Sequence, residues 1–267
     1  MDCQKVTQNI RNEFKNYMVQ HHLKSVVLGI SGGIDSCLVA ALAKPICDEI
    51  GIKLIGRSLP IITNKLDELN RANIVGEAFC HDYKEVNLET QYDIFNNITV
   101  EVEGKLENET REKIRKGNIK ARCRMIYLYN LAYTYNGLVL STDNLTELNL
   151  GFSTIMGDWG DYAMIQYLWK TEVYKLADYL KNEYTFDKAK EALERTIQAV
   201  PTDGLGVSNS DLDQIQASSY DEVDEILQSY LYNGDKTYIN HPVIQRYESS
   251  HFKRNWPIRI DRKNLFQ

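Results

Sequence analysis

The sequence has few of the residues that mark cross-linked, fibrous or disordered proteins. Its 267 residues include only 5 prolines, 15 glycines and 5 cysteines, whereas 43% of the residues are hydrophobic. The cysteines are odd in number, and no two of them have the Cys-x-x-Cys spacing of redox motifs and many zinc sites. These features exclude collagen-like, disulfide-scaffold and low-complexity proteins, and predict a globular protein with a sizeable core.

Long apolar runs and an excess of positive charge are also missing. The longest purely apolar run, residues 37–43, is far shorter than the roughly 20 residues that span a bilayer. The N-terminus is polar and lacks the basic-then-apolar pattern of a signal peptide. With 31 basic and 37 acidic residues, the net charge is −6, which disfavours nucleic-acid binding. We therefore expect a cytoplasmic protein whose partners include neither a membrane nor a nucleic acid.

Strand and helix patterns alternate through the first half of the chain. The predicted helices cover residues 6–22, 35–50, 65–80 and 111–135. The predicted strands cover residues 25–30, 53–59, 84–88 and 137–141. Such alternation is typical of βαβ units, so we expect an α/β fold with a parallel, Rossmann-like sheet flanked by helices. A segment rich in Glu, Asn and Thr, residues 98–110, is predicted to be a mobile loop.

Strand signals fade in the second half, where helical patterns dominate. These patterns cover residues 170–184, 186–198, 220–231 and 241–248. We expect one domain over residues 1–267, with an α/β core at about 1–150. Residues 151–267 are expected to form a helical part that covers the sheet.

The most specific motif is residues 29–36, Gly-Ile-Ser-Gly-Gly-Ile-Asp-Ser, where an apolar strand is predicted to turn into a helix. The first N–H groups of such a helix lack partners and lie at the positive end of the helix dipole, so they attract anions. Adjacent glycines let a phosphate approach the backbone, and Ser31 and Ser36 add hydroxyl groups. A plain strand–helix turn capped by Asp35 would require neither feature. The motif therefore predicts a phosphate-binding loop.

Asp35 distinguishes this loop from the better-known phosphate loops. A Walker loop ends in Gly-Lys-Ser/Thr, and the sequence does not have the Gly-x-Gly-x-x-Gly dinucleotide pattern either. A carboxylate repels phosphate unless a divalent cation lies between the two groups. Asp35 is therefore predicted to be a magnesium ligand.

Residues 31–36, Ser-Gly-Gly-Ile-Asp-Ser, resemble the loop of the N-type ATP pyrophosphatases. These enzymes cleave ATP between the α and β phosphates to adenylate a substrate, and include GMP synthetase, asparagine synthetase, tRNA-thiolating enzymes and NAD synthetase. Later segments resemble the NAD synthetases in particular. Residues 117–125 are similar to their KGNxxARxRM motif, and residues 141–148 to their GTxxxxE segment. Further matches follow in order as far as residues 252–254, so the resemblance covers nearly the whole chain.

The resemblance implies an adenine nucleotide alpha hydrolase-like fold and the activity of an ammonia-dependent NAD synthetase. Such a ligase amidates deamido-NAD with ATP and ammonia through an adenylated intermediate, releasing AMP and pyrophosphate. The implied cofactor is Mg²⁺, and the implied assembly is a homodimer, to which the tyrosine-rich helix at 111–135 would contribute. The implied ATP-binding residues are Gly29, Ile30, Ser31, Gly32, Gly33, Ile34, Asp35, Ser36, Thr142, Lys170 and Thr202. The implied metal ligands are Asp35 and Glu147, and the implied deamido-NAD-binding residues are Arg122, Asp161 and Lys253.

Four residues depart from the family pattern, and all four lie in the substrate half. Ile155 stands where the family usually has a lysine, Trp159 where it has a small residue, Met164 where it has proline and Phe252 where it has histidine. Adenylation is thus better supported than the identity of the carboxylate. One alternative is a related ATP pyrophosphatase that amidates or thiolates another substrate, although the unpaired cysteines and negative charge argue against tRNA thiolation. A non-catalytic nucleotide-binding protein is disfavoured because both predicted metal ligands are present.

Chain length bears on the nitrogen donor. A glutaminase domain would need roughly another 250 residues and its own catalytic cysteine, so free ammonia is the expected donor. The adenylate needs no nucleophilic side chain, and catalysis is expected to rest on positioning and charge stabilisation. Arg122 and Arg124, two apart on a predicted helix, project in different directions, so at most one is expected to reach any single phosphate.

Overall fold

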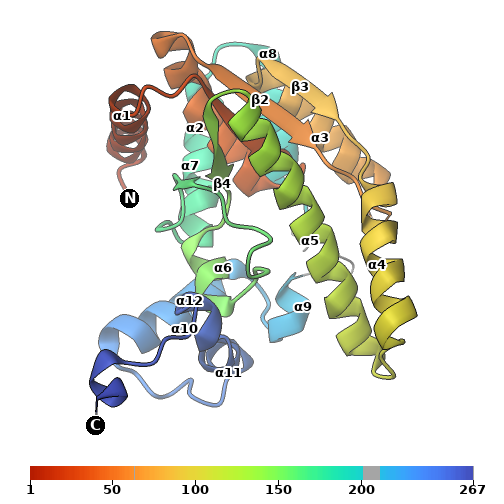
Figure 1. The fold of residues 1–267 in the computed structure, drawn as a ribbon. Helices are drawn as coiled ribbons and strands as arrows, with labels where there is room; N and C mark the ends of the chain where they lie inside the picture. The colour runs from red at the N-terminus through yellow and green to blue at the C-terminus, as the bar shows by residue number, and fades with distance from the viewer. Residues whose placement is uncertain (63, 201–210, 267) are drawn as a thin grey trace.

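Five parallel strands form the centre of the molecule, and their order is β3-β2-β1-β4-β5 (Figure 1). The computed structural model describes residues 1–62, 64–200 and 211–266. The strands are β1 (Ser25–Gly29), β2 (Lys53–Ser58), β3 (Asp82–Glu85), β4 (Gly137–Ser141) and β5 (Tyr162–Ala163). The predicted α/β class with a parallel sheet is confirmed.

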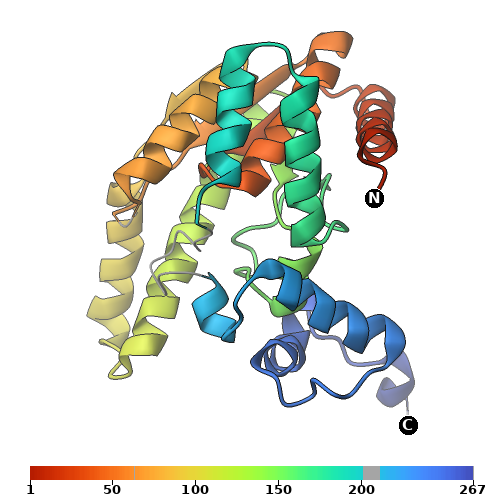
Figure 2. The ribbon, with the colours of Figure 1, turned by 180° about the vertical axis from the view of Figure 1, so that it is seen from behind.

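Helices cover both faces of the sheet, as a parallel sheet requires (Figures 1 and 2). Along β1, Val26 and Leu28 pack into one layer and Val27 into the other, and all three are fully buried. The first layer contains α1 (Cys3–Gln20), α2 (Ile34–Ile50), α3 (Leu66–Phe79), α7 (Lys170–Glu183) and α8 (Asp187–Ile197). The second layer contains α4 (Glu89–Glu103) and α5 (Glu109–Thr134).

The remaining helices form a third cluster beside the carboxyl ends of the strands (Figure 1). They are α6 (Leu145–Leu150), α9 (Asp211–Ile215), α10 (Tyr220–Asn233), α11 (Pro242–Ser249) and α12 (His251–Arg254), followed by a short 3-10 helix, Arg262–Leu265. Leu150, Val223, Leu227 and Ile244 make the buried centre of this cluster. The helices of the second half therefore fall into two groups: α7 and α8 pack against the sheet, whereas the later helices belong to the third cluster. Within the residues described, no helix is both long and apolar enough to cross a membrane.

Two expectations about local structure were wrong. The segment predicted to be a loop at 98–110 is mostly helical, and only residues 104–108 separate α4 from α5. Gly104, with φ +80°, ends α4, and the side chain of Asn108 caps α5 by accepting a hydrogen bond from Arg111 N. The third strand lies at 82–85 instead of 84–88, where it pairs with β2 at the edge of the sheet.

The order of connections reverses beside β1. The chain adds β2 and β3 on one side of β1, then returns to add β4 on the other. At such a point the loops that leave two neighbouring strands diverge and open a crevice at the carboxyl ends. The loop after β1 is the glycine-rich motif, and the chain after β4 carries Thr142 and Glu147. The topology therefore brings together the segments in which ATP and metal ligands were predicted.

Candidate active site

The glycine-rich loop leads directly into α2, whose N-cap is Gly33. Gly32 has φ +80°, and a Cβ atom there would lie 2.3 Å from the backbone oxygen of Glu68 on α3. Glycine is required at this position because the backbone of the loop touches the backbone of α3. The Oγ of Ser36 donates to the backbone oxygen of Gly33 at 3.1 Å and lies 3.1 Å from the Oγ of Ser31. These contacts fix the shape of the loop.

A cavity of about 560 Å³ lies at the carboxyl ends of β1 and β4. Its wall includes most of the predicted ATP-binding residues: Gly29, Ile30, Ser31, Gly33, Ile34, Asp35, Ser36, Thr142 and Lys170. Gly32 sits within the same loop, against α3. Thr202 lies outside the described residues. Segments far apart in the sequence thus converge on one cavity, although their binding of ATP remains a prediction.

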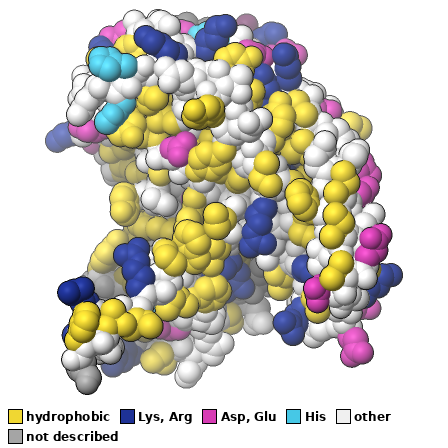
Figure 3. Space-filling model, viewed as in Figure 1, with side chains coloured by type: hydrophobic (Ala, Val, Ile, Leu, Met, Phe, Trp, Pro, Cys, Tyr) yellow, Lys and Arg dark blue, Asp and Glu magenta, His cyan; other side chains and the backbone are white. Residues whose placement is uncertain are grey.

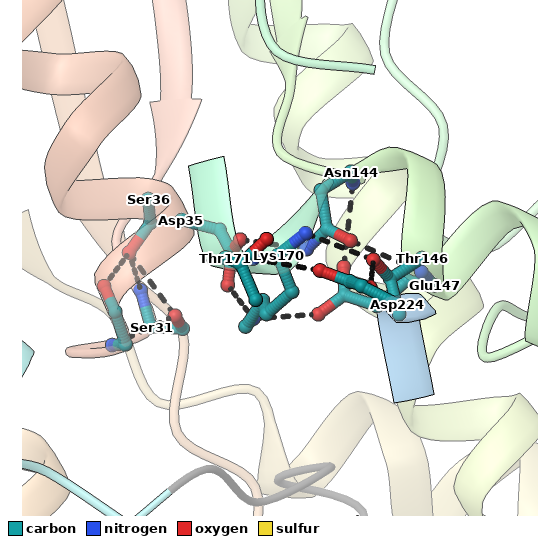
Figure 4. Close-up of polar contacts among 10 residues, drawn as sticks. Ser31, Asp35, Ser36, Asn144, Thr146, Glu147, Lys170, Thr171 and Asp224 are labelled. Carbon is teal, nitrogen blue, oxygen red and sulfur yellow. Dashed lines mark hydrogen bonds and ion pairs between the residues drawn. The ribbon is translucent and has the colours of Figure 1, made fainter. Parts of the chain in front are cut away.

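The centre of the site is an ammonium group held between two carboxylates (Figure 4). The Nζ of Lys170 lies 2.5 Å from Oδ2 of Asp35 and 2.8 Å from Oε1 of Glu147. Lys170 is only 2% exposed. Burial opposes its charge, but the charges of Asp35 and Glu147 outweigh this effect and raise the pKa of Lys170 well above its ordinary value. The lysine is therefore charged. Its two ion pairs link α7 to α2 and to α6.

Asn144, which the sequence analysis did not select, orients both carboxylates. Its Nδ2 donates to Oδ1 of Asp35 at 2.8 Å, and its Oδ1 accepts from the backbone N–H of Glu147 at 3.0 Å. The backbone N–H of Asn144 donates in turn to Glu147 Oε2 at 3.4 Å, which completes a capping box at the start of α6. The spacing of Asn144 and Glu147 is the sequence signal that could have identified this residue.

The donor set fits the predicted magnesium ion. Mg²⁺ is usually bound by one or two carboxylates together with phosphate oxygens and water. Asp35 and Glu147 come from different helices and already share one cation, so both can face the same charge. The described part of the chain contains no group of three or more His, Cys, Asp or Glu side chains able to hold a metal. Phosphate oxygens and water would complete the coordination of a magnesium ion held by these two carboxylates.

Two further acids, Asp143 and Asp158, line the same cavity. Burial, supplemented by the charges of Asp158 and Glu147, raises the pKa of Asp143 well above its ordinary value. Burial also raises the pKa of Asp158. The Oγ of Ser141 donates to Asp143 at 2.8 Å, and the backbone N–H of Thr154 donates to Asp158. Burial of this kind could not be read from the sequence because it depends on how the loops fold over the cavity.

The wall formed by α11 and α12 carries two cations. Arg246 donates from Nε to the backbone oxygen of Leu150 at 2.8 Å, and Lys253 donates from Nζ to the backbone oxygens of Gly151 and Ser153. Burial lowers the pKa of Arg246, and burial together with the charge of Arg246 lowers the pKa of Lys253. Both side chains line the cavity, so this wall favours an anionic group.

The other two predicted substrate residues lie outside the cavity wall. Arg122 is exposed and donates from Nε and Nη2 to the backbone oxygen of Ile155, at 3.3 Å in each case. Arg124, two residues along α5, lines the cavity instead. Asp161 accepts a hydrogen bond from the backbone N–H of Val139 in β4 at 2.9 Å. A role for Arg122 and Asp161 in substrate binding stays a prediction.

The fold and the site define an α/β protein with a parallel sheet, in which a glycine-rich loop after β1 and an acid after β4 meet in one cavity. Residues 6–257 match the family described as NAD synthase, and the chain belongs to that family. The NH(3)-dependent NAD(+) synthetase of Thermoplasma acidophilum is 32% identical over 240 residues, which cover 88% of this chain and 89% of that protein.

Solved structures show the same relationship over the whole fold. The NMN synthetase from Francisella tularensis has a TM-score of 0.80 at 25% identity, covering 98% of this chain and 99% of that one. The NH3-dependent NAD synthetase from Campylobacter jejuni has a TM-score of 0.71 at 27% identity, covering 98% and 100%. The family predicted from the motifs is therefore confirmed.

Proposed function

We propose that the protein is an ammonia-dependent NAD synthetase, a ligase that amidates the nicotinate carboxylate of deamido-NAD at the expense of ATP. The observation that carries the proposal is the shared contact of Lys170 with Asp35 and Glu147 beside the glycine-rich loop. The names of the relatives support the same activity. The cavity lies between the α/β core and the C-terminal helices, which supports one domain with a substrate-side part after about residue 150.

The proposed reaction has two steps. The nicotinate carboxylate attacks the α-phosphate of ATP, forming an adenylate as pyrophosphate leaves. Ammonia then attacks the carboxyl carbon of the adenylate, AMP leaves, a proton is released, and the amide is formed. The residues of the loop and Thr142 would hold the ATP phosphates, and Asp35 and Glu147 would hold Mg²⁺, which supplies positive charge beside the departing pyrophosphate. Lys170 would orient both carboxylates and add a further positive charge.

A second substrate, nicotinate mononucleotide, is favoured by a specific set of observations. The NMN synthetase from Francisella tularensis has a higher TM-score than the Campylobacter jejuni NAD synthetase, 0.80 against 0.71. Ile155 lacks the lysine charge expected from the family pattern, and Arg122 and Asp161 bind backbone groups outside the cavity. Arg246 and Lys253 would suffice to bind the single phosphate of the smaller nucleotide.

One experiment separates these two substrates. The purified protein is supplied with ATP, Mg²⁺ and ammonium, together with either deamido-NAD or nicotinate mononucleotide, and AMP and the amide product are measured. A higher kcat/KM for deamido-NAD supports the first proposal, and a higher kcat/KM for the mononucleotide supports the second. If neither amide forms while the protein still binds ATP, both are wrong. Asp35→Asn serves as the control, because it lacks one of the two predicted metal ligands. Product that forms equally well with this variant does not come from the proposed metal site.

We further propose a cytoplasmic homodimer in which α4 and α5 form the contact. Both helices expose apolar side chains, and Figure 3 shows hydrophobic groups along this side of the molecule. The exposed residues are Ile94, Phe95, Ile98 and Val102 on α4 and Ile114, Ile126, Tyr129 and Tyr133 on α5. Extended exposed apolar patches commonly mark interaction sites. All five cysteines are free thiols, which suits a reducing compartment.

A further inference from the structure

Asp224, on α10, is a buried carboxylate that the proposed chemistry does not use. It is 2% exposed, and burial raises its pKa. Its Oδ1 accepts a hydrogen bond from the Oγ1 of Thr146 at 2.5 Å, and its Oδ2 accepts one from the backbone N–H of Thr171 at 2.9 Å. No lysine or arginine in the described part of the chain forms an ion pair with Asp224. Burying a carboxylate without a counter-ion is costly, and these hydrogen bonds offset part of that cost.

The partners of Asp224 cap the helix that carries the central lysine. Helix α7 begins at Lys170, and the side chain of its N-cap residue, Trp169, makes no capping hydrogen bond. The backbone N–H of Lys170 donates instead to the Oγ1 of Thr146 at 2.8 Å, and the N–H of Thr171 donates to Asp224. The first two amides of α7 are thus satisfied by residues of α6 and α10. A negative charge at this end of the helix also interacts favourably with the helix dipole.

The contacts of Asp224 and Thr146 lie directly beside the ion pairs of Lys170 with Asp35 and Glu147. Thr146 directly precedes Glu147, and the backbone of Lys170 binds Thr146 while its Nζ binds Glu147 and Asp35 (Figure 4). A single hydrogen-bonded unit therefore fixes the beginnings of both α6 and α7. This unit therefore connects α10 to both Lys170 and Glu147.

We propose that Asp224 and Thr146 are positioning residues that hold Lys170 and Glu147 in the arrangement that binds Mg²⁺ and the phosphates of ATP. The inference rests on the proposed ATP site. Through this unit, α10 controls the geometry of the phosphate site without touching the nucleotide. A merely structural unit would hold α6, α7 and α10 together and would affect stability alone.

The test is the affinity of the full-length protein for Mg·ATP, measured by titration calorimetry without ammonia or a nicotinate substrate. Thr146→Val removes the hydroxyl but keeps the shape of the side chain, and Asp224→Asn removes the charge and one acceptor. Both are expected to weaken Mg·ATP binding about 10-fold, as is usual when a group that orients a metal ligand is lost. Thr146→Ser, which retains the hydroxyl, restores the wild-type affinity. Glu225→Gln is the matched control, because Glu225 is exposed on the same helix as Asp224. The affinity of this variant for Mg·ATP is expected to stay within about twofold of the wild-type value.

Thermal stability is measured for each variant, so that lost affinity is not confused with unfolding. The inference is overturned if Thr146→Val binds Mg·ATP like the wild type, or if Thr146→Ser loses as much affinity as Thr146→Val. Variants that melt earlier but keep the wild-type affinity also overturn it, because their role is then structural. If Asp224→Asn does not fold, the comparison of Thr146→Val with Thr146→Ser still tests the inference. Failure of the proposed function has a different signature, which is the absence of amide product in the wild type.

Discussion

The Nζ of Lys170 lies 2.5 Å from Oδ2 of Asp35, although the two residues are 135 positions apart in the sequence. Asp35 follows β1 and Lys170 begins α7, so this contact joins the glycine-rich loop to the second half of the chain. The same ammonium also binds Glu147 at 2.8 Å. Lys170 therefore shares both of its partners with the predicted magnesium ion. A magnesium ion bound as predicted would act on the same two negative charges as the lysine.

Replacing Lys170 by methionine should reveal this shared role. The substitution leaves two partly buried carboxylates without their buried cation, so the free energy of unfolding is expected to fall by about 3 kcal/mol. Mg²⁺ can supply the missing charge, so it should raise the Tm of Lys170→Met more than that of the wild type. The measurement is thermal unfolding with and without Mg²⁺. Lys188→Met is the control, because Lys188 forms an exposed ion pair with Glu77. An equal effect of Mg²⁺ on the wild type and Lys170→Met would contradict the shared site.

Gly32→Ala tests the contact between the loop and α3. The added Cβ would lie 2.3 Å from the backbone oxygen of Glu68, at a φ of +80°, so the loop must move. ATP affinity, measured by calorimetry, is expected to fall at least about 10-fold, together with a lower Tm. Gly51→Ala is the matched control, since Gly51 has φ +70° but open space around its Cβ. It should lower Tm and leave ATP affinity unchanged. If the two variants lose ATP affinity equally, the contact with α3 is not what shapes the loop.

The buried carboxyl of Asp143 should affect how stability depends on pH. Its pKa is raised above the ordinary value of 3.8, so its contribution to stability is complete below that pH and is lost as the pH rises through the folded-state pKa. Asp143→Asn cannot titrate and avoids this loss. The variant is therefore expected to be more stable than the wild type at neutral pH, and the difference should shrink toward pH 3.8. Urea unfolding at a series of pH values measures it, with Asp93→Asn on the exposed surface of α4 as the control. A difference that does not change with pH would contradict the prediction.

The sequence predicts those parts of the site whose chemistry is local. Adjacent glycines, serines and Asp35 directly after an apolar strand indicate a phosphate loop because strand, turn and helix follow one another in the chain. The sequence could not show that Lys170 is buried against Asp35, since that contact depends on the packing of α7 on α2. Asp224 was missed for a similar reason, because it acts through Thr146 and not through a motif of its own. The end of α4 was mistaken for a loop because its polar composition outweighed its helical spacing.

Ile155→Lys tests which nicotinate nucleotide the site prefers. A lysine at this position restores the charge of the family pattern, and the backbone oxygen that binds Arg122 remains in place. If the second phosphate of deamido-NAD lies nearby, KM for deamido-NAD should fall severalfold, while KM for nicotinate mononucleotide should change little. Steady-state kinetics with both substrates measure the difference, and Ile155→Met controls for the change in side-chain shape. An equal change in both KM values would show that position 155 does not distinguish the two nucleotides.

The proposed dimer depends on apolar groups that α5 exposes, so a charge placed among them should separate the subunits. Ile126 and Tyr133 are 61% and 91% exposed, and a buried glutamate without a partner is costly in an interface. Ile126→Glu combined with Tyr133→Glu is therefore expected to halve the mass measured by light scattering during size-exclusion chromatography. Ile258→Glu is the matched control, because Ile258 is 78% exposed but lies outside α4 and α5, and its mass should equal that of the wild type. A wild type that elutes as a monomer would contradict the proposed dimer, and a double variant that remains a dimer would show that these residues of α5 do not form the contact.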